Sequence, residues 1–217
     1  MTYVIGFVSQ KGGVGKSTLA RLIAREAAAG GLSVKIADLD AQQATCTHWA
    51  TRRTDNNIKP SVRVEAYNDL TTALKDSSQF EVFLIDGAPH SSRETMEIAK
   101  ASDFVVIPTG QGVDDLRPSV LLAHELVKKG IDRAKITFAL SKVSDSFKEI
   151  LEARRYLESA DYRVLTGEVP HRTGFSKALD QGKAISETPF KTLTKRAEKM
   201  AQGIIDGVAS SIEREVA

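Results

Sequence analysis

A cluster of glycines and lysines near the N-terminus has the composition of a phosphate-binding loop. Residues 10–18 read Gln-Lys-Gly-Gly-Val-Gly-Lys-Ser-Thr, in which Gly15, Lys16 and Ser17 match the end of the P-loop motif, while Gln10 replaces its leading glycine. Glycines let backbone N–H groups converge on phosphate oxygens, Lys16 supplies a charge between the β- and γ-phosphates, and Ser17 can offer its hydroxyl to Mg²⁺. A glycine-rich turn without a ligand is the alternative, but the lysine and hydroxyl at this spacing favour nucleotide binding.

Two apolar segments end in carboxylates, which could hold a metal ion or orient a water molecule. Residues 82–85 deliver Asp86, which is the pattern of a Walker B aspartate that holds Mg²⁺ through a coordinated water. Residues 33–39 include Asp38 and are followed by Asp40, so two carboxylates lie at the end of this segment. Ligands bind at the carboxyl ends of parallel strands, so these carboxylates should lie near the γ-phosphate. Each could also cap the helix that follows its strand.

The elements that must position these residues alternate between strand and helix, which predicts an α/β fold. We expect a mostly parallel, twisted sheet of seven or eight strands with helices on both faces, in a single domain over residues 1–217. Strands are predicted at 3–9, 33–39, 62–67, 82–85, 104–107, 136–140 and 162–169. Helices are predicted from Ser17 to the glycine pair at 30–31 and at 42–52, 69–76, 92–101, 116–129, 146–159, 174–181 and 190–215.

Composition excludes several classes of protein. The 217 residues are 41% hydrophobic and carry one cysteine, Cys46, which rules out an internal disulfide, a four-cysteine zinc site and a cluster held by cysteines of one chain. No apolar run approaches the roughly 20 residues that a membrane span needs, and the N-terminus lacks the pattern of a signal peptide. The net charge of +2 does not argue for a nucleic-acid partner, so any such case needs a local basic patch.

Lys11, directly before the glycine pair, adds a feature that the common P-loop lacks. The loop with this extra lysine resembles the deviant Walker A loop of the ParA and MinD group of P-loop ATPases. The segment 38–42, Asp-Leu-Asp-Ala-Gln, is similar to the family's Asp-x-Asp-Pro-Gln motif, from which Ala41 departs. The resemblance extends through Ile107-Pro108 to the C-terminal segment, and it implies an ATPase that binds ATP and Mg²⁺.

The resemblance also implies roles for individual residues. Lys11, Lys16 and Asp40 would be catalytic: Lys11 reaches across a nucleotide-sandwich homodimer to the partner's phosphates, and Asp40 orients the attacking water. Ser17 and Asp86 would hold Mg²⁺, and Asp38 would support the metal shell or the switch. The residues expected to bind the nucleotide are Lys11, Gly12, Gly13, Val14, Gly15, Lys16, Ser17 and Thr18, with Pro170, beside Val169 and His171, near the adenine.

A basic segment near the C-terminus is the candidate DNA interface. In the family, ATP-bound dimers bind DNA without sequence preference, and residues 171–200 hold seven basic and three acidic residues, a net charge of +4. A solvated helix face is the alternative. The basic residues are Arg172, Lys177, Lys183, Lys191, Lys195, Arg196 and Lys199.

The resemblance implies a small ParA-type partition ATPase without an N-terminal DNA-binding extension. It would act in the cytoplasm, associate with the nucleoid in its ATP state, and segregate a plasmid, chromosome region or other cargo with a ParB-like partner that stimulates slow hydrolysis. Factors of conjugative transfer or of protein-complex positioning are alternatives. A membrane-cycling protein of the MinD kind is another, but the tail from Gly203 lacks a basic cluster, which disfavours stable membrane association. A small-molecule ligase would usually lack Lys11, and an iron protein would need more cysteines than Cys46.

Overall fold

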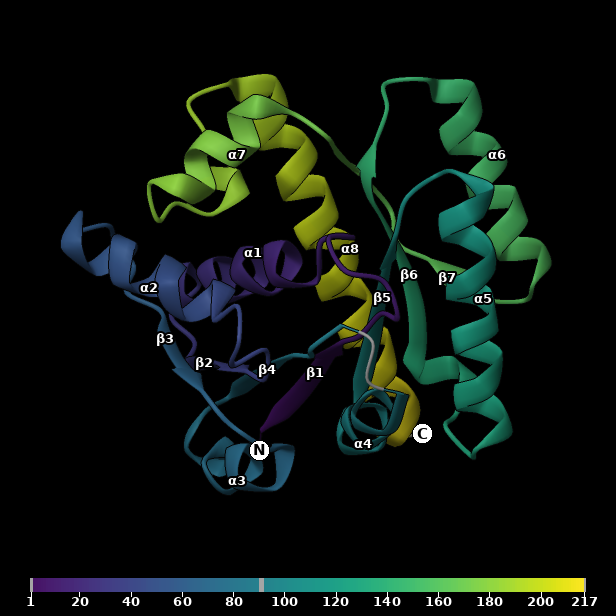
Figure 1. Cartoon of the computed structure of the whole chain (residues 1–217), viewed down its shortest axis with the longest axis horizontal. Helices are drawn as coiled ribbons and strands as arrows, with labels where there is room; N and C mark the ends of the chain where they lie inside the picture. Colours follow the sequence, from purple (N-terminus) through teal and green to yellow (C-terminus); the bar gives the residue numbers. More distant parts are fainter. Residues whose placement is uncertain (1, 90–91, 217) are drawn as a thin grey trace.

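A twisted parallel sheet forms the centre of the molecule (Figure 1). The computed structural model describes residues 2–89 and 92–216, and within these ranges the sheet has eight strands in the order β3-β2-β4-β1-β5-β6-β7, with β8 also paired to β6. All the pairings are parallel. The strands are β1 (Tyr3–Phe7), β2 (Val34–Asp38), β3 (Arg63–Ala66), β4 (Val82–Asp86), β5 (Phe104–Thr109), β6 (Ile136–Val143), β7 (Arg163–Val164) and β8 (Val169–Pro170). The predicted α/β fold is confirmed.

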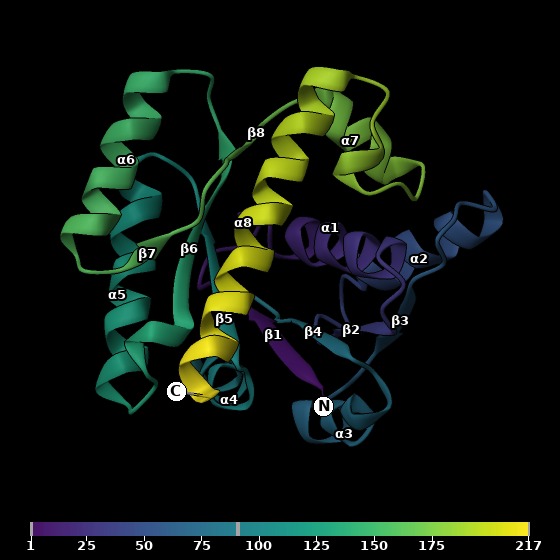
Figure 2. The same ribbon diagram turned by 180° about the vertical axis from the view of Figure 1, so that it is seen from behind.

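Helices cover both faces of the sheet (Figures 1 and 2). One apolar cluster joins the sheet to α1 (Lys16–Ala29), α2 (Thr45–Asp55), α7 (Thr173–Asp180) and α8 (Lys191–Val216). A second cluster joins the opposite face to α3 (Leu70–Lys75), α4 (Ser92–Ala101), α5 (Val113–Lys128) and α6 (Phe147–Ser159). Because successive strand side chains point to opposite faces, Ile36 belongs to the first cluster and Ala37 to the second. Burial on both faces explains the near-continuous apolar strands.

The last predicted strand differs from the observed one. Instead of one strand over 162–169, the chain forms two short strands, β7 and β8, which both pair with β6. Gly167 between them has a φ of +86°, and a Cβ there would lie 2.8 Å from the backbone nitrogen of Met200. The close packing of α8 therefore requires a left-handed glycine at this point, and such a residue interrupts the strand.

Helix α2 begins at Thr45, later than the predicted residue 42. Ala44 adopts the left-handed conformation, with φ of 45°, and its N–H donates to the carbonyl of Asp40 at 2.7 Å. This turn separates the end of β2 from the helix, so Asp40 lies in a loop and not in a regular element.

The C-terminal half of α2 is fastened to the segment that follows α7. Arg53, which is 1% exposed, forms an ion pair with Glu187 at 2.6 Å and donates to the carbonyl of Gly182 at 3.1 Å. The indole of Trp49 donates to the carbonyl of Lys183 at 3.0 Å. Burial alone would raise the pKa of Glu187, but hydrogen bonds from Arg53 and from the N–H of Ala184 outweigh burial and lower it below 4.5.

Replacing Glu187 should therefore destabilise the fold. Glu187→Gln leaves the buried Arg53 charge uncompensated, and we expect the free energy of unfolding at pH 7 to fall by about 3 kcal/mol. Because the pKa of Glu187 is lowered by folding, its contribution is present above pH 4.5 and is lost as the pH falls below that value. Urea unfolding at pH 7 and at pH 3.5 measures both effects.

The control for this prediction is Glu152→Gln, since Glu152 pairs with Lys148 on an exposed surface at 3.9 Å. It should leave stability almost unchanged, because exposed ion pairs contribute little. A Glu187→Gln protein as stable as this control would contradict the role of the buried pair.

Candidate functional site

The glycine loop between β1 and α1 has the backbone geometry of an anion cradle. Gly13 and Gly15 have φ values of 74° and 111°, which residues other than glycine rarely adopt. A Cβ on Gly15 would collide with the Oγ of Ser141 on β6. No side chain caps the start of α1 at Gly15, so the N–H groups of the helix's first turn remain available to a ligand. Val14 is buried and anchors the loop.

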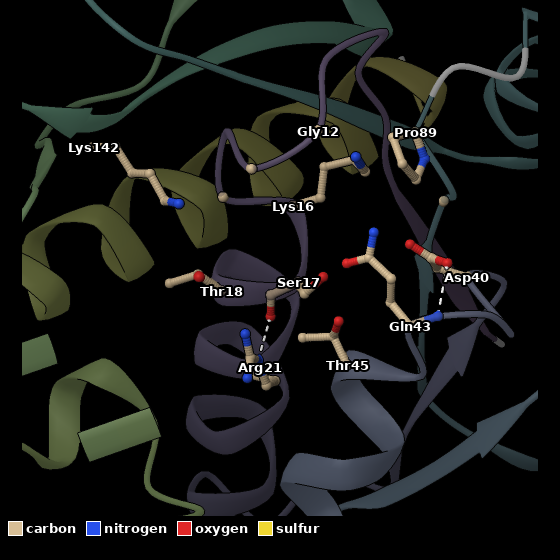
Figure 3. A pocket seen from close by; sticks show the side chains of 13 residues that line it. Gly12, Lys16, Ser17, Thr18, Arg21, Asp40, Gln43, Thr45, Pro89 and Lys142 are labelled. Carbon is tan, nitrogen blue, oxygen red and sulfur yellow. Dashed lines mark hydrogen bonds between the residues drawn. The ribbon is translucent and has the colours of Figure 1, made fainter. Parts of the chain in front are cut away.

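The loop borders a pocket of about 170 Å³, shown in Figure 3. Lys16, 7% exposed, extends into it, and burial lowers the pKa of its ammonium although the nearby carboxylates of Asp86 and Asp40 act to raise it. Lys16 forms no ion pair with the described residues, so its charge is available for a phosphate. The pocket is lined by Gly12, Gly13, Gly15, Lys16, Ser17, Thr18, Arg21, Asp40, Gln43, Thr45, Gly87, Pro89 and Lys142.

Asp86 lies behind this pocket as a buried carboxylate with one oxygen unused. It is 1% exposed, and its Oδ1 accepts no hydrogen bond from the described residues, whereas Oδ2 accepts one from the thiol of Cys46 at 3.2 Å. Burial raises the pKa of Asp86 to about 6, although hydrogen bonds from Ser17 and Cys46 act to lower it. An unpaired buried carboxylate oxygen near a serine hydroxyl fits a hydrated Mg²⁺ ion, which binds oxygen donors.

Asp38 is the neighbour of Asp86 across the sheet, since the two residues are register partners on β2 and β4. Its Oδ2 accepts from the backbone N–H of Cys46 at 3.0 Å and from that of Thr47 at 3.1 Å, and its Oδ1 accepts from the N–H of Asp40 at 3.3 Å. Burial raises the pKa of Asp38, and these hydrogen bonds oppose the rise. Because the start of α2 occupies Oδ2 and the N–H of Asp40 occupies Oδ1, the geometry favours its interpretation as a switch residue over that as a direct metal ligand.

Asp40 reaches the pocket itself. Its Oδ1 accepts from the N–H of Gln43 at 3.2 Å, and in Figure 3 its carboxylate stands across the pocket from Lys142. The loop after β2 therefore holds the Asp40 carboxylate near Lys16, whose pKa it acts to raise.

Lys11 points away from the pocket and toward α5. Its Nζ forms an ion pair with Asp115 at 2.8 Å and donates to the carbonyl of Asp114. Both side chains are more than a third exposed, and exposed ion pairs are weak. Lys11 is thus held within its own chain by a weak ion pair, in which another anion could replace Asp115.

Several residues of the pocket were not predicted from the sequence. Lys142 lines it from β6 with a left-handed φ of 56°, which nothing in its sequence context indicates. Arg21, which is 5% exposed, donates to the carbonyl of Ser17 at 2.7 Å and so stabilises the end of the loop. Its spacing of four residues from Ser17 is the one sequence feature that could have indicated this contact. Pro170, predicted near the adenine, pairs with Val143 and does not line the pocket.

The predicted DNA-binding residues divide into three groups by their exposure and their partners. Arg172 and Arg196 are engaged by Asp145, and Arg196 also by Glu168 at 3.4 Å. Lys183 is half-buried. The remaining side chains are exposed, and three of them share one face of α8 at four-residue spacing. The exposed residues are Lys177, Lys191, Lys195 and Lys199.

The shape of the glycine loop gives a direct test of the pocket. Gly15→Ala introduces both a disfavoured φ and a collision with Ser141, so binding of a fluorescent ADP analogue should weaken by at least about tenfold, equivalent to 1.4 kcal/mol. Gly31→Ala is the control, because Gly31 has a similar φ of +87° but open space around it. The control should lower the melting temperature and leave binding intact. Equal binding by both variants would contradict the assignment of the loop.

Comparison with known proteins agrees with this geometry. Residues 5–185 match the family described as the CobQ/CobB/MinD/ParA nucleotide binding domain, whereas no curated protein matches the chain significantly in sequence. Among solved structures, the septum site-determining protein MinD of Pyrococcus horikoshii, complexed with Mg-ADP, aligns with a TM-score of 0.74 at 17% identity, covering 94% of this chain and 96% of that chain.

Two further solved structures align over nearly the whole chain. A putative plasmid partition protein of Borrelia burgdorferi bound to AMPPNP aligns with a TM-score of 0.71 at 18% identity, covering 95% of this chain and 99% of that one. The pNOB8 ParA aligns with a TM-score of 0.71 at 18% identity, covering 99% and 100%. At these identities the structures show a shared fold, and the family match spans most of the chain. The chain therefore belongs to the CobQ/CobB/MinD/ParA family of nucleotide-binding domains.

Proposed function

We propose that this protein is a Mg²⁺-dependent ATPase that dimerises on ATP, binds DNA without sequence preference in that state, and segregates a plasmid, chromosome region or other cargo with a ParB-like partner. The observation that carries the proposal is the pocket that joins the glycine loop, Lys16 and Asp40, with the unpaired oxygen of Asp86 behind it. The Mg-ADP in the MinD structure and the AMPPNP in the Borrelia partition protein support a nucleotide at the corresponding place.

The glycine loop, Lys16, Ser17, Asp40 and Asp86 each have a role in this proposal. The N–H groups of the loop and Lys16 bind the phosphates, and Thr18 lies beside them. Ser17 and Asp86 would hold Mg²⁺, which when bound neutralises phosphate charge. Asp40 orients the attacking water, because its carboxylate lies at the pocket with only the N–H of Gln43 as its hydrogen-bond donor among the described residues.

Lys11 couples nucleotide binding to dimerisation in the proposal. In the monomer its ammonium rests on Asp115 at the start of α5. The γ-phosphate bound by a second subunit carries more charge than one carboxylate, and it offers Lys11 a stronger, charge-assisted contact. ATP thereby favours the dimer, and hydrolysis removes the attraction.

The exposed lysines of α8 form the proposed DNA surface. Lys191, Lys195 and Lys199 lie at i, i+4 and i+8, and no ion pair to a described residue engages them. Dimerisation doubles this surface, so that DNA affinity follows the nucleotide state. Arg172 and Arg196 contribute less, since Asp145 already neutralises part of their charge.

A MinD-like, membrane-cycling protein is the second candidate. Two isoleucines, Ile205 and Ile212, are 45% and 40% exposed near the end of α8. Among the described residues, no helix is both long and apolar enough to span a bilayer. This candidate would be favoured if the protein co-sedimented with anionic vesicles in the presence of ATP and did not bind DNA-coated beads under the same conditions.

The nucleotide switch is tested by two substitutions. Lys16→Gln should abolish ATP binding, because it removes the buried charge that meets the phosphates. Asp40→Ala should bind ATP normally, hydrolyse it at least about a hundredfold more slowly through loss of the oriented water, and accumulate as a DNA-bound dimer. Sedimentation with ATP or ADP and a phosphate-release assay measure these outcomes. A monomeric Asp40→Ala protein in saturating ATP would refute the switch.

The DNA surface predicts a change in salt dependence. Replacing Lys191, Lys195 and Lys199 by Gln should weaken ATP-dependent DNA binding and make the slope of log K against log salt shallower by about 0.9 for each phosphate that the variant no longer neutralises. Filter binding between about 50 and 200 mM salt measures the slope. The matched control replaces three exposed lysines on other helices, for which no ion pair to a described residue is found: Lys75, Lys100 and Lys128. If the control weakens DNA binding as much, the α8 face is not the interface.

A further inference from the structure

Cys46 lies where three segments meet: the glycine loop, the end of β2 with Asp38, and the end of β4 with Asp86. The proposed hydrolysis gives Cys46 no role. Its side chain is fully buried at the start of α2. The Sγ atom is 3.2 Å from Oδ2 of Asp86 and 3.8 Å from the carbonyl of Ser17, and the backbone N–H donates to Asp38 at 3.0 Å. One residue therefore contacts the glycine loop, the switch aspartate and the metal carboxylate.

We propose that Cys46 is a positioning residue that orients Asp86 toward the metal. This inference rests on the proposed function. The thiol donates its hydrogen to Oδ2, so Oδ2 is occupied and Oδ1 is the oxygen left for the water of a hydrated Mg²⁺ ion. A carboxylate without such a donor can rotate about its Cβ–Cγ bond, and hydrogen bonds from outside the metal shell commonly suppress this freedom.

The surroundings of the thiol indicate that it acts as a hydrogen-bond donor and not as a metal ligand or a reactive nucleophile. The Sγ atom lies 3.2 Å from a carboxylate oxygen of Asp86, which accepts the hydrogen bond, so the thiol is its donor. Within the described ranges, no group of three or more histidine, cysteine, aspartate or glutamate side chains could hold a metal ion by itself. Cys46 thus acts on the metal only through Asp86.

The contact also ties the metal carboxylate to the switch helix. Asp38 holds the N–H groups of Cys46 and Thr47, which belong to the first turn of α2. The thiol reaches Asp86 only while that turn is in place. Displacement of the start of α2 would remove the donor from Asp86, so Mg²⁺ affinity depends on the position of the segment that carries Asp40 and Gln43.

The test compares variants that separate donation from packing. Cys46→Val keeps an apolar side chain of similar size without a donor, Cys46→Ala removes the donor and leaves a small cavity, and Cys46→Ser keeps a donor. Ile23→Val is the control, because it removes one methylene from the same apolar cluster on α1. The measurement is equilibrium binding of a fluorescent ADP analogue as Mg²⁺ is titrated, with a parallel series in EDTA, and melting temperatures verify that each variant is folded.

We expect Cys46→Val and Cys46→Ala to raise the Mg²⁺ concentration at half-saturation about tenfold, which is the lower end of the effects of removing a hydrogen bond to a metal-holding side chain. Cys46→Ser should stay within about threefold of the unaltered protein, because it keeps a donor. Binding in EDTA and the Ile23→Val control should be unchanged. Equal Mg²⁺ dependence in all proteins, or an equal loss in the serine and valine variants, would overturn the positioning role. Failure of the unaltered protein to bind ADP would instead refute the proposed function.

Discussion

The proximity of two buried carboxylates is the constraint on which the rest of the site depends. Asp38 and Asp86 end neighbouring parallel strands in the same register and are 0% and 1% exposed. Burial of like charges side by side is costly unless each charge gains partners. Asp38 gains them from the first turn of α2, which fixes where that helix starts. Asp86 gains the thiol of Cys46 and keeps one oxygen that accepts no hydrogen bond from the described residues, so the same constraint shapes the switch and the proposed metal site.

Helix α2 connects this constraint to the other end of the molecule. Its first turn is held by Asp38, and its last turns are held by the segment after α7 through Trp49, Arg53 and Glu187. That segment leads into α8 and its exposed lysines. The pocket and the segment that leads to the proposed DNA surface are therefore joined by one helix with buried polar contacts at both ends.

Much of this architecture could be predicted from the sequence, because its signals are local. The glycine loop, the apolar strand before Asp86 and the alternation of strands and helices depend on neighbouring residues. The contacts that were not predicted join residues far apart in the chain. Asp145 pairs with Arg172 and Arg196, which lie 27 and 51 residues further along the chain. Lys142 lines the pocket with a left-handed backbone, and the break between β7 and β8 follows from packing against α8. Such contacts depend on the tertiary fold and leave no local pattern.

The central claim is that the paired carboxylates and the glycine loop form one nucleotide site completed by a metal ion. Calorimetric titration of ATP into the unaltered protein, once with Mg²⁺ and once with EDTA, tests it most directly. The account predicts one nucleotide bound per chain, with markedly tighter binding when Mg²⁺ is present, because the cation engages the Asp86 oxygen that accepts no hydrogen bond from the described residues. Absence of binding, or equal affinity in Mg²⁺ and EDTA, would contradict it.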